Sequence, residues 1–168
     1  AAMLPRWAFG YIQSKERYET QDELLAVARE YRRRGLPLDC VVLDWKSWTG
    51  ELWGQKSLDA ERFPDPDRLT RDLHELDVRL MVSIWPTMRP GGEDWREFSE
   101  AGQLLGNGAT YDAFDPDARA RYWRQTERGL FSHGVDAWWT DCTEPFEADW
   151  LGPVKPDPEE RMRINSAE

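Results

Sequence analysis

The chain has 168 residues, which is long enough for one domain with a sizeable hydrophobic core. It carries 32 acidic and 22 basic side chains, and the resulting net charge of −10 argues against nucleic acid as a partner, because binding to phosphates requires a basic face. No segment approaches the roughly 18 uncharged apolar residues of a membrane span, so we expect no membrane partner.

Four short apolar runs predict β-strands, over residues 7–13, 39–45, 79–85 and 135–141. The last three are nearly continuous in hydrophobicity, which is typical of strands covered on both faces. A strand of this kind belongs to a parallel sheet rather than to a sheet with one face in water.

Helical segments lie between these strands. The first follows a capping box formed by Thr20 and Glu23, and two more begin at the Asp-Pro pairs 65–66 and 115–116. A shorter amphipathic segment covers residues 94–101. Alternating strands and helices predict β-α-β units with a parallel sheet, and such sheets bind ligands beyond the carboxyl ends of their strands.

Acidic and aromatic residues gather at these predicted strand ends. Asp44 and Asp141 each end a strand in which apolar residues precede the carboxylate on the same face, and Trp45 and Trp85 stand at the ends of two strands. Converging carboxylates beside indole rings favour a sugar site, because carboxylates cleave glycosidic bonds and indole faces stack on sugar rings. The competing interpretation is equally simple: such an Asp often only caps the next helix, and Trp138 and Trp139 often only fill a core.

Nothing in the sequence indicates a cofactor or a metal. The two cysteines, Cys40 and Cys142, are too few for a zinc site or a disulfide framework, and the default for both is a buried thiol. The glycine pairs do not match a phosphate-binding loop.

Taken together, these motifs resemble glycoside hydrolase family 31. The segment WWTDCTEP at 138–145 is similar to the nucleophile signature of that family, and WAFGYIQS at 7–14 is similar to its first barrel strand. Further similarities follow in the same order along the chain, at 35–45 for the second strand, at 63–66 for an F-P-D-P helix start and at 83–86 for the third strand.

The resemblance implies a retaining α-glycosidase on a (β/α)8 barrel, acting on a glycoside or oligosaccharide. It implies that Asp141 is the nucleophile that forms a glycosyl-enzyme intermediate. It also implies that Asp44 binds sugar hydroxyls and that Trp45 and Trp85 line the same subsite. Cys142 stands next to the nucleophile where the family often has Met, and is expected to border the sugar.

The resemblance also implies that residues 1–168 form only part of the catalytic domain, with barrel strands one to four. A retaining mechanism needs a second carboxylate as acid and base, which in this family comes from the second half of the barrel. Glu144, Glu147 and Asp149 do not match its motif. We therefore expect the chain to be inactive alone and to pair with the missing half or with another copy, because an open sheet exposes its edges.

Several functions remain open at this point. Trp48 and Trp53 resemble the α-xylosidase branch of the family, whereas Lys46 beside Asp44 could favour a substituted or acidic sugar. A non-catalytic carbohydrate-binding or scaffold module could use the same tryptophans. A nucleotide-binding α/β domain is disfavoured, because residues 13–16 replace the required glycine-rich turn.

Overall fold

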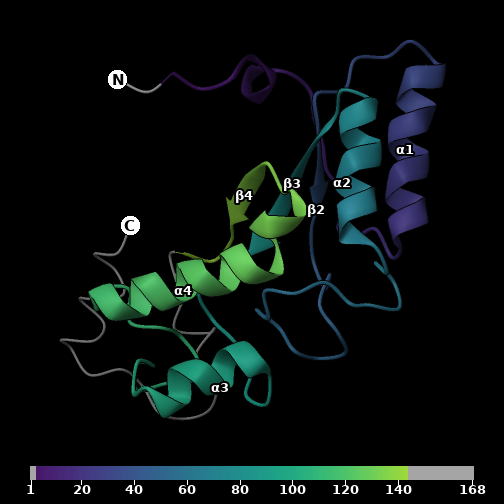
Figure 1. The fold of residues 1–168 in the computed structure, drawn as a ribbon. Helices are drawn as coiled ribbons and strands as arrows, with labels where there is room; N and C mark the ends of the chain where they lie inside the picture. The colour runs from purple at the N-terminus through teal and green to yellow at the C-terminus, as the bar shows by residue number, and fades with distance from the viewer. Residues whose placement is uncertain (1–2, 144–168) are drawn as a thin grey trace.

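The computed structural model describes residues 3–143. The strands form one parallel four-stranded sheet whose order in space, β1-β2-β3-β4, is also the order in the chain. Helices follow the strands as the alternation predicts (Figure 1). The elements are η1 (Arg6–Phe9), β1 (Ile12–Gln13), α1 (Gln21–Arg33), β2 (Cys40–Leu43), α2 (Pro66–Glu75), β3 (Arg79–Ile84), α3 (Glu93–Glu100), α4 (Pro116–Gly129), η2 (Phe131–His133) and β4 (Ala137–Thr140). A sequential parallel sheet is the arrangement of a (β/α)8 barrel, and these units are consistent with its first half.

The helices begin where the capping residues predict. The Thr20 hydroxyl accepts a hydrogen bond from the backbone N–H of Glu23 at 3.2 Å, which starts α1. The carboxylates of Asp65 and Asp115 do the same for the first turns of α2 and α4, each with proline following directly. α3 begins at Glu93, one residue before the predicted start.

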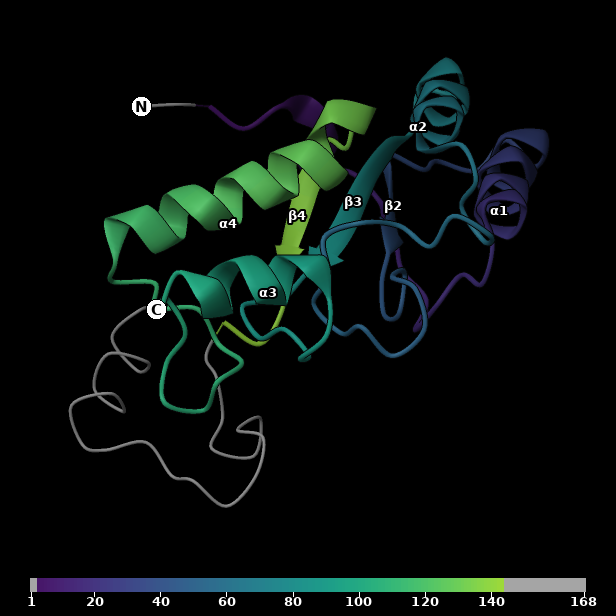
Figure 2. The same cartoon turned by 60° about the horizontal axis from the view of Figure 1, so that its bottom comes forward.

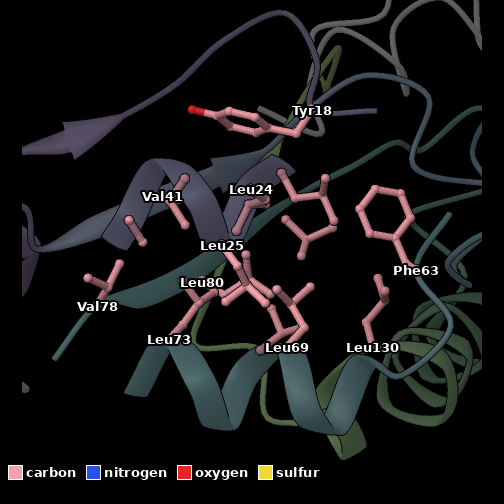
Figure 3. Packing of buried hydrophobic residues seen from close by; sticks show 14 of the residues in the cluster. Tyr18, Leu24, Leu25, Val41, Phe63, Leu69, Leu73, Val78, Leu80 and Leu130 are labelled. Carbon is pink, nitrogen blue, oxygen red and sulfur yellow. The ribbon is translucent and has the colours of Figure 1, made fainter. Parts of the chain in front are cut away.

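The main hydrophobic core lies between one face of the sheet and helices α1 and α2, which run side by side in Figure 1. Figure 3 shows leucines of α1 and α2 packed together with residues of β2 and β3. The fully buried members include Leu24, Leu69, Leu73, Val41 and Leu80. Burying these side chains is the main favourable contribution to folding, at about 1.5–3 kcal/mol each, and it attaches the helices to the sheet.

Two predictions about the strands were wrong. Residues 7–13 do not form one strand: Arg6–Phe9 is a 3-10 helix, and β1 contains two residues. The aromatic run there is exposed, with Phe9 76% accessible, and gives no buried surface to keep the chain extended. β4 is not covered on both faces, since its burial falls along the strand and Trp139 is 51% exposed. β4 is an edge strand of this sheet, and its outer side has no further strand among residues 3–143.

Within the same residues, no helix is long and apolar enough to cross a membrane.

Candidate functional site

The long loops gather at one end of the sheet. Because the strands are parallel, their carboxyl ends face the same way, and Figure 2 shows the arrowheads of β2, β3 and β4 directed toward the side where α3 and the long loops lie. Asp44 follows β2, Trp85 follows β3, and Asp141 follows β4 directly. The structure therefore brings the three predicted strand ends to a common edge.

The strand register also places these side chains on one face. Val42 is opposite Met81, and Met81 is opposite Ala137. Alternate residues of a strand share a face, so the positions two and four residues further along stay on that face. The core residues Val41, Leu43 and Leu80 occupy the other, helix-covered face. The face turned away from the helices therefore carries Asp44, Trp85, Trp139 and Asp141.

Asp44 and Asp141 interact electrostatically. Partial burial raises the pKa of Asp44 above its ordinary value, a hydrogen bond from the backbone of Trp45 opposes this shift, and the negative charges of Asp141 and Glu16 raise the pKa further. Glu16 lies in the loop that follows β1. Carboxylates from separate strand ends thus lie close enough to influence each other, as the sequence predicts for Asp44 and Asp141.

The backbone around Asp141 is held on both sides. Its N–H donates to the carbonyl oxygen of Ile84 at 3.0 Å, which extends the β3–β4 ladder by one residue. Its side chain accepts a hydrogen bond from the N–H of Cys142 at 2.9 Å. Cys142 adopts a left-handed conformation with φ 48°, so the chain turns sharply directly after the carboxylate. Residues from Glu144 on, including the last two positions of the signature motif and the acids Glu147 and Asp149, lie outside the described residues.

Four tryptophans form a cluster beside the carboxylates. The ring of Trp45 lies 5.2 Å from Trp48, 5.5 Å from Trp53 and 5.4 Å from Trp85, all edge to face. Trp53 and Trp85 are themselves 5.2 Å apart. Aromatic pairs in this geometry each add about 0.5–1.5 kcal/mol beyond burial. We call Trp45, Trp48, Trp53 and Trp85 the tryptophan cluster; Trp48 and Trp85 are buried, while Trp45 and Trp53 are partly accessible.

The two neighbouring tryptophans of β4 have different environments. Trp138 packs against the main core, as a core-filling side chain should. Trp139 is half-exposed on the same face as the carboxylates, so the core-filling interpretation is wrong for this residue. The indole of Trp139 offers an aromatic surface two residues before Asp141.

Lys46 and Lys56 both lie in the loop between β2 and α2, but they differ in burial and in their charged partners. The ammonium group of Lys46 is paired with the carboxylate of Glu51 at 2.5 Å, so its charge is compensated. Lys56 is 2% exposed and was missed in the sequence, where one lysine within a polar loop carries no pattern that indicates burial.

Among residues 3–143 no group of three His, Cys, Asp or Glu side chains could hold a metal ion. Cys40 is buried, and burial raises the pKa of its thiol to about 12, so this thiol is not reactive.

Comparison with known proteins gives consistent matches. The α-xylosidase of Saccharolobus solfataricus is 37% identical over 145 residues, which are 86% of this chain and 20% of that protein. The α-xylosidase A of Aspergillus niger is 28% identical over 152 residues, or 82% of this chain and 20% of that protein.

Solved structures agree with these relatives. The crystal structure of a family 31 α-xylosidase from Xanthomonas citri superimposes with a TM-score of 0.83 at 37% identity, covering 97% of this chain and 19% of that chain. A family 31 α-xylosidase from a soil metagenome, complexed with xylose, gives a TM-score of 0.78 at 38% identity, covering 85% and 23%. The chain thus spans about a fifth of the length of these proteins.

The sequence model of the glycosyl hydrolases family 31 TIM-barrel domain matches residues 1–166. This match includes every strand and helix of the structure and both carboxylates at the strand ends. The chain therefore belongs to glycoside hydrolase family 31, within its TIM-barrel domain.

Proposed function

We propose that residues 1–168 are the first half of the catalytic barrel of a retaining α-glycosidase, with Asp141 as its nucleophile. The observation that carries this proposal is that Asp44 and Asp141 lie at strand ends on one face of the sheet, close enough to interact electrostatically, with Trp45 of the tryptophan cluster directly after Asp44. Family membership supports the same assignment, because the position of Asp141 in the motif WWTDCTEP is that of the family's nucleophile.

In the proposed reaction, the Asp141 carboxylate attacks the anomeric carbon of an α-glycoside while the leaving-group oxygen takes a proton from a second carboxylic acid. A covalent β-glycosyl ester on Asp141 forms, and water then hydrolyses it with the second residue acting as base. Two inversions return the α-configuration. The second carboxylate comes from the remaining strands of the barrel, so this chain alone is expected to be inactive.

The other site residues have binding roles in this proposal. Asp44 accepts hydrogen bonds from sugar hydroxyls, which are strong when the acceptor is charged. Trp45 and Trp85 form the wall of the sugar subsite, and Cys142 borders it next to the nucleophile. The hydrogen bond from the Cys142 N–H holds the carboxylate of Asp141 in one orientation, which favours a single direction of attack.

For the substrate we propose an α-xyloside or α-glucoside, with xylosides preferred. The relatives from S. solfataricus and A. niger and the two structural neighbours are α-xylosidases. A neutral sugar also fits the loop, because Glu51 already compensates the one ammonium group next to Asp44 and Trp45. An acidic sugar would have to displace that ion pair.

The test uses the complete barrel that contains this chain, assayed on aryl α-xyloside and aryl α-glucoside. Asp141→Ala should abolish turnover, and added azide should restore product formation as the β-glycosyl azide, because a small anion then replaces the missing nucleophile. An α-azide, or normal hydrolysis by the variant, would contradict the role of Asp141. A wild-type barrel that binds xylose but cleaves neither substrate would favour a carbohydrate-binding module.

A further inference from the structure

Lys56 carries an ammonium group inside the protein, in the same loop as Trp48 and Trp53 of the tryptophan cluster. The ammonium nitrogen lies 3.3 Å from Oε1 of Gln125, 3.4 Å from Sδ of Met88 and 3.5 Å from the carbonyl oxygen of Gly54. It also lies 4.3 Å from the centre of the Tyr122 ring, in a cation–π arrangement. The charge therefore has partners but no direct carboxylate contact.

The charged groups that face Lys56 come from α3 and α4. The backbone N–H of Lys56 donates to Oδ2 of Asp94 at 2.6 Å. Arg128 donates to the carboxylates of Asp94 and Glu97, and Gln125 donates to Glu97 at 2.9 Å. Burial lowers the pKa of Lys56 to about 8, while Asp94 and Glu97 counteract part of this shift and Arg128 adds to it. Lys56 is therefore mostly charged at neutral pH and loses its charge just above it.

Two short routes connect this lysine to the tryptophans. Tyr122, whose ring lies under the ammonium group, donates its hydroxyl hydrogen bond to the carbonyl oxygen of Trp85 at 3.0 Å. On the other side, Gly54 accepts from Lys56 and directly follows Trp53, whose own carbonyl oxygen accepts from the N–H of Arg89 at 2.8 Å. Lys56 thus contacts Gly54, which directly follows Trp53, and Tyr122, which is hydrogen-bonded to the backbone of Trp85.

We propose that Lys56 is a positioning residue. Its buried ammonium group fixes the positions of Trp53 and Trp85 relative to each other, so that the tryptophan cluster forms a rigid surface on one side of the sugar subsite. An apolar side chain of the same length would fill the space without the cost of burying a charge. The ammonium group adds what an apolar side chain cannot: simultaneous attraction to the Tyr122 ring, to Gln125 and to the backbone of the loop that carries Trp53.

The first test is spectroscopic and uses the complete barrel that contains this chain. Near-ultraviolet circular dichroism reports how rigidly indole rings are held. Tyr122, the tyrosine in contact with Lys56, stays protonated from pH 6.5 to 9, since burial raises its pKa well above the ordinary value of 10. The wild type should show one transition near pH 8 in the tryptophan bands. Lys56→Met should lack this transition and resemble the high-pH wild type at every pH. The control Lys15→Met, which alters an exposed lysine, should keep the transition.

The second test measures kinetics in the complete barrel and rests on the proposed function. A surface that binds the substrate and the transition state equally well contributes to KM but not to kcat. Disordering such a surface therefore raises KM more than it lowers kcat. We expect Lys56→Met to raise KM about tenfold, the effect of one lost charge-assisted hydrogen bond, with kcat changed less than about twofold. Tyr122→Phe, which keeps the ring but removes the bond to Trp85, should raise KM in the same direction and serves if Lys56→Met does not fold.

The two tests separate the two claims. If the wild-type barrel has no glycosidase activity, the proposed function fails, and the spectroscopic transition alone decides the role of Lys56. If the barrel is active but Lys56→Met and Tyr122→Phe keep the wild-type KM, or if the transition near pH 8 persists without Lys56, the positioning role is wrong.

Discussion

Gly54 offers a sharp test of how the loop that carries Trp53 is packed. Its φ is 79°, in the left-handed region, and a Cβ atom there would lie 2.0 Å from the carbonyl oxygen of Thr87. Alanine at this position meets a conformational cost of about 1–2 kcal/mol. It also meets an overpacking cost of about 1–3 kcal/mol, because the obstructing atom belongs to the backbone and cannot rotate away. Gly54→Ala should therefore lower the free energy of unfolding by roughly 3 kcal/mol.

Gly50 is the matched control in the same loop. Its φ of 54° is also left-handed, but a Cβ atom there would have no neighbour within 4 Å. Gly50→Ala should therefore cost only the conformational part, about 1 kcal/mol. Urea unfolding at one fixed protein concentration measures both values, and the expected difference is about 2 kcal/mol. Equal losses for the two variants would refute the close approach of this loop to Thr87.

Three further predictions follow from the charges and edges of the structure. The pKa of Lys56 is about 8 in the folded chain, against an ordinary value of 10.5. Between these pH values the unfolded chain binds more protons than the folded chain, so the folded state gains stability as the pH rises. The free energy of unfolding of the wild type, relative to that of Lys56→Met, should therefore rise by about 3 kcal/mol in total. Urea unfolding at pH 7 and pH 10.5 measures this change, and a constant difference would contradict the buried charge. Asp141→Asn should lower the pKa of Asp44, because it removes one of the charges that raise it; an unchanged carboxyl-carbon NMR titration of Asp44 would mean that the two side chains are apart. The chain alone should self-associate through its open sheet edges at β1 and β4, and a stable monomer in light scattering would exclude this.

The sequence was sufficient for those parts of the fold that depend on local chemistry. Thr20, Asp65 and Asp115 cap helices because their side chains satisfy N–H groups in the next turn, an interaction within three residues. The strands β2 and β3 were predicted because an unbroken apolar run has few other ways to leave water. Asp44 and Asp141 could be placed on one face because period-two alternation and parallel pairing are general rules.

What the sequence did not predict depends on distant contacts. The short β1 pairs only Ile12 and Gln13 with β2. The aromatic residues before it gave a false strand pattern, because aromatic residues are enriched in strands only where neighbouring strands and a core pack against them. The exposure of Trp139 follows from its place in an edge strand, on the sheet face turned away from the helices, which no local pattern records. Lys56 is buried by Tyr122 and Gln125, more than 60 positions further along the chain, and a lysine in a loop is normally exposed.

The central claim is that Asp141 forms a covalent bond to the sugar. The most direct measurement treats the complete barrel with a 5-fluoro-α-glycosyl fluoride, which traps the glycosyl-enzyme intermediate, and locates the label by mass spectrometry of proteolytic peptides. We predict one label per protein, on the carboxylate of Asp141, with loss of activity in proportion to labelling. A label on another carboxylate, or none while the enzyme turns over substrate, would contradict the assignment.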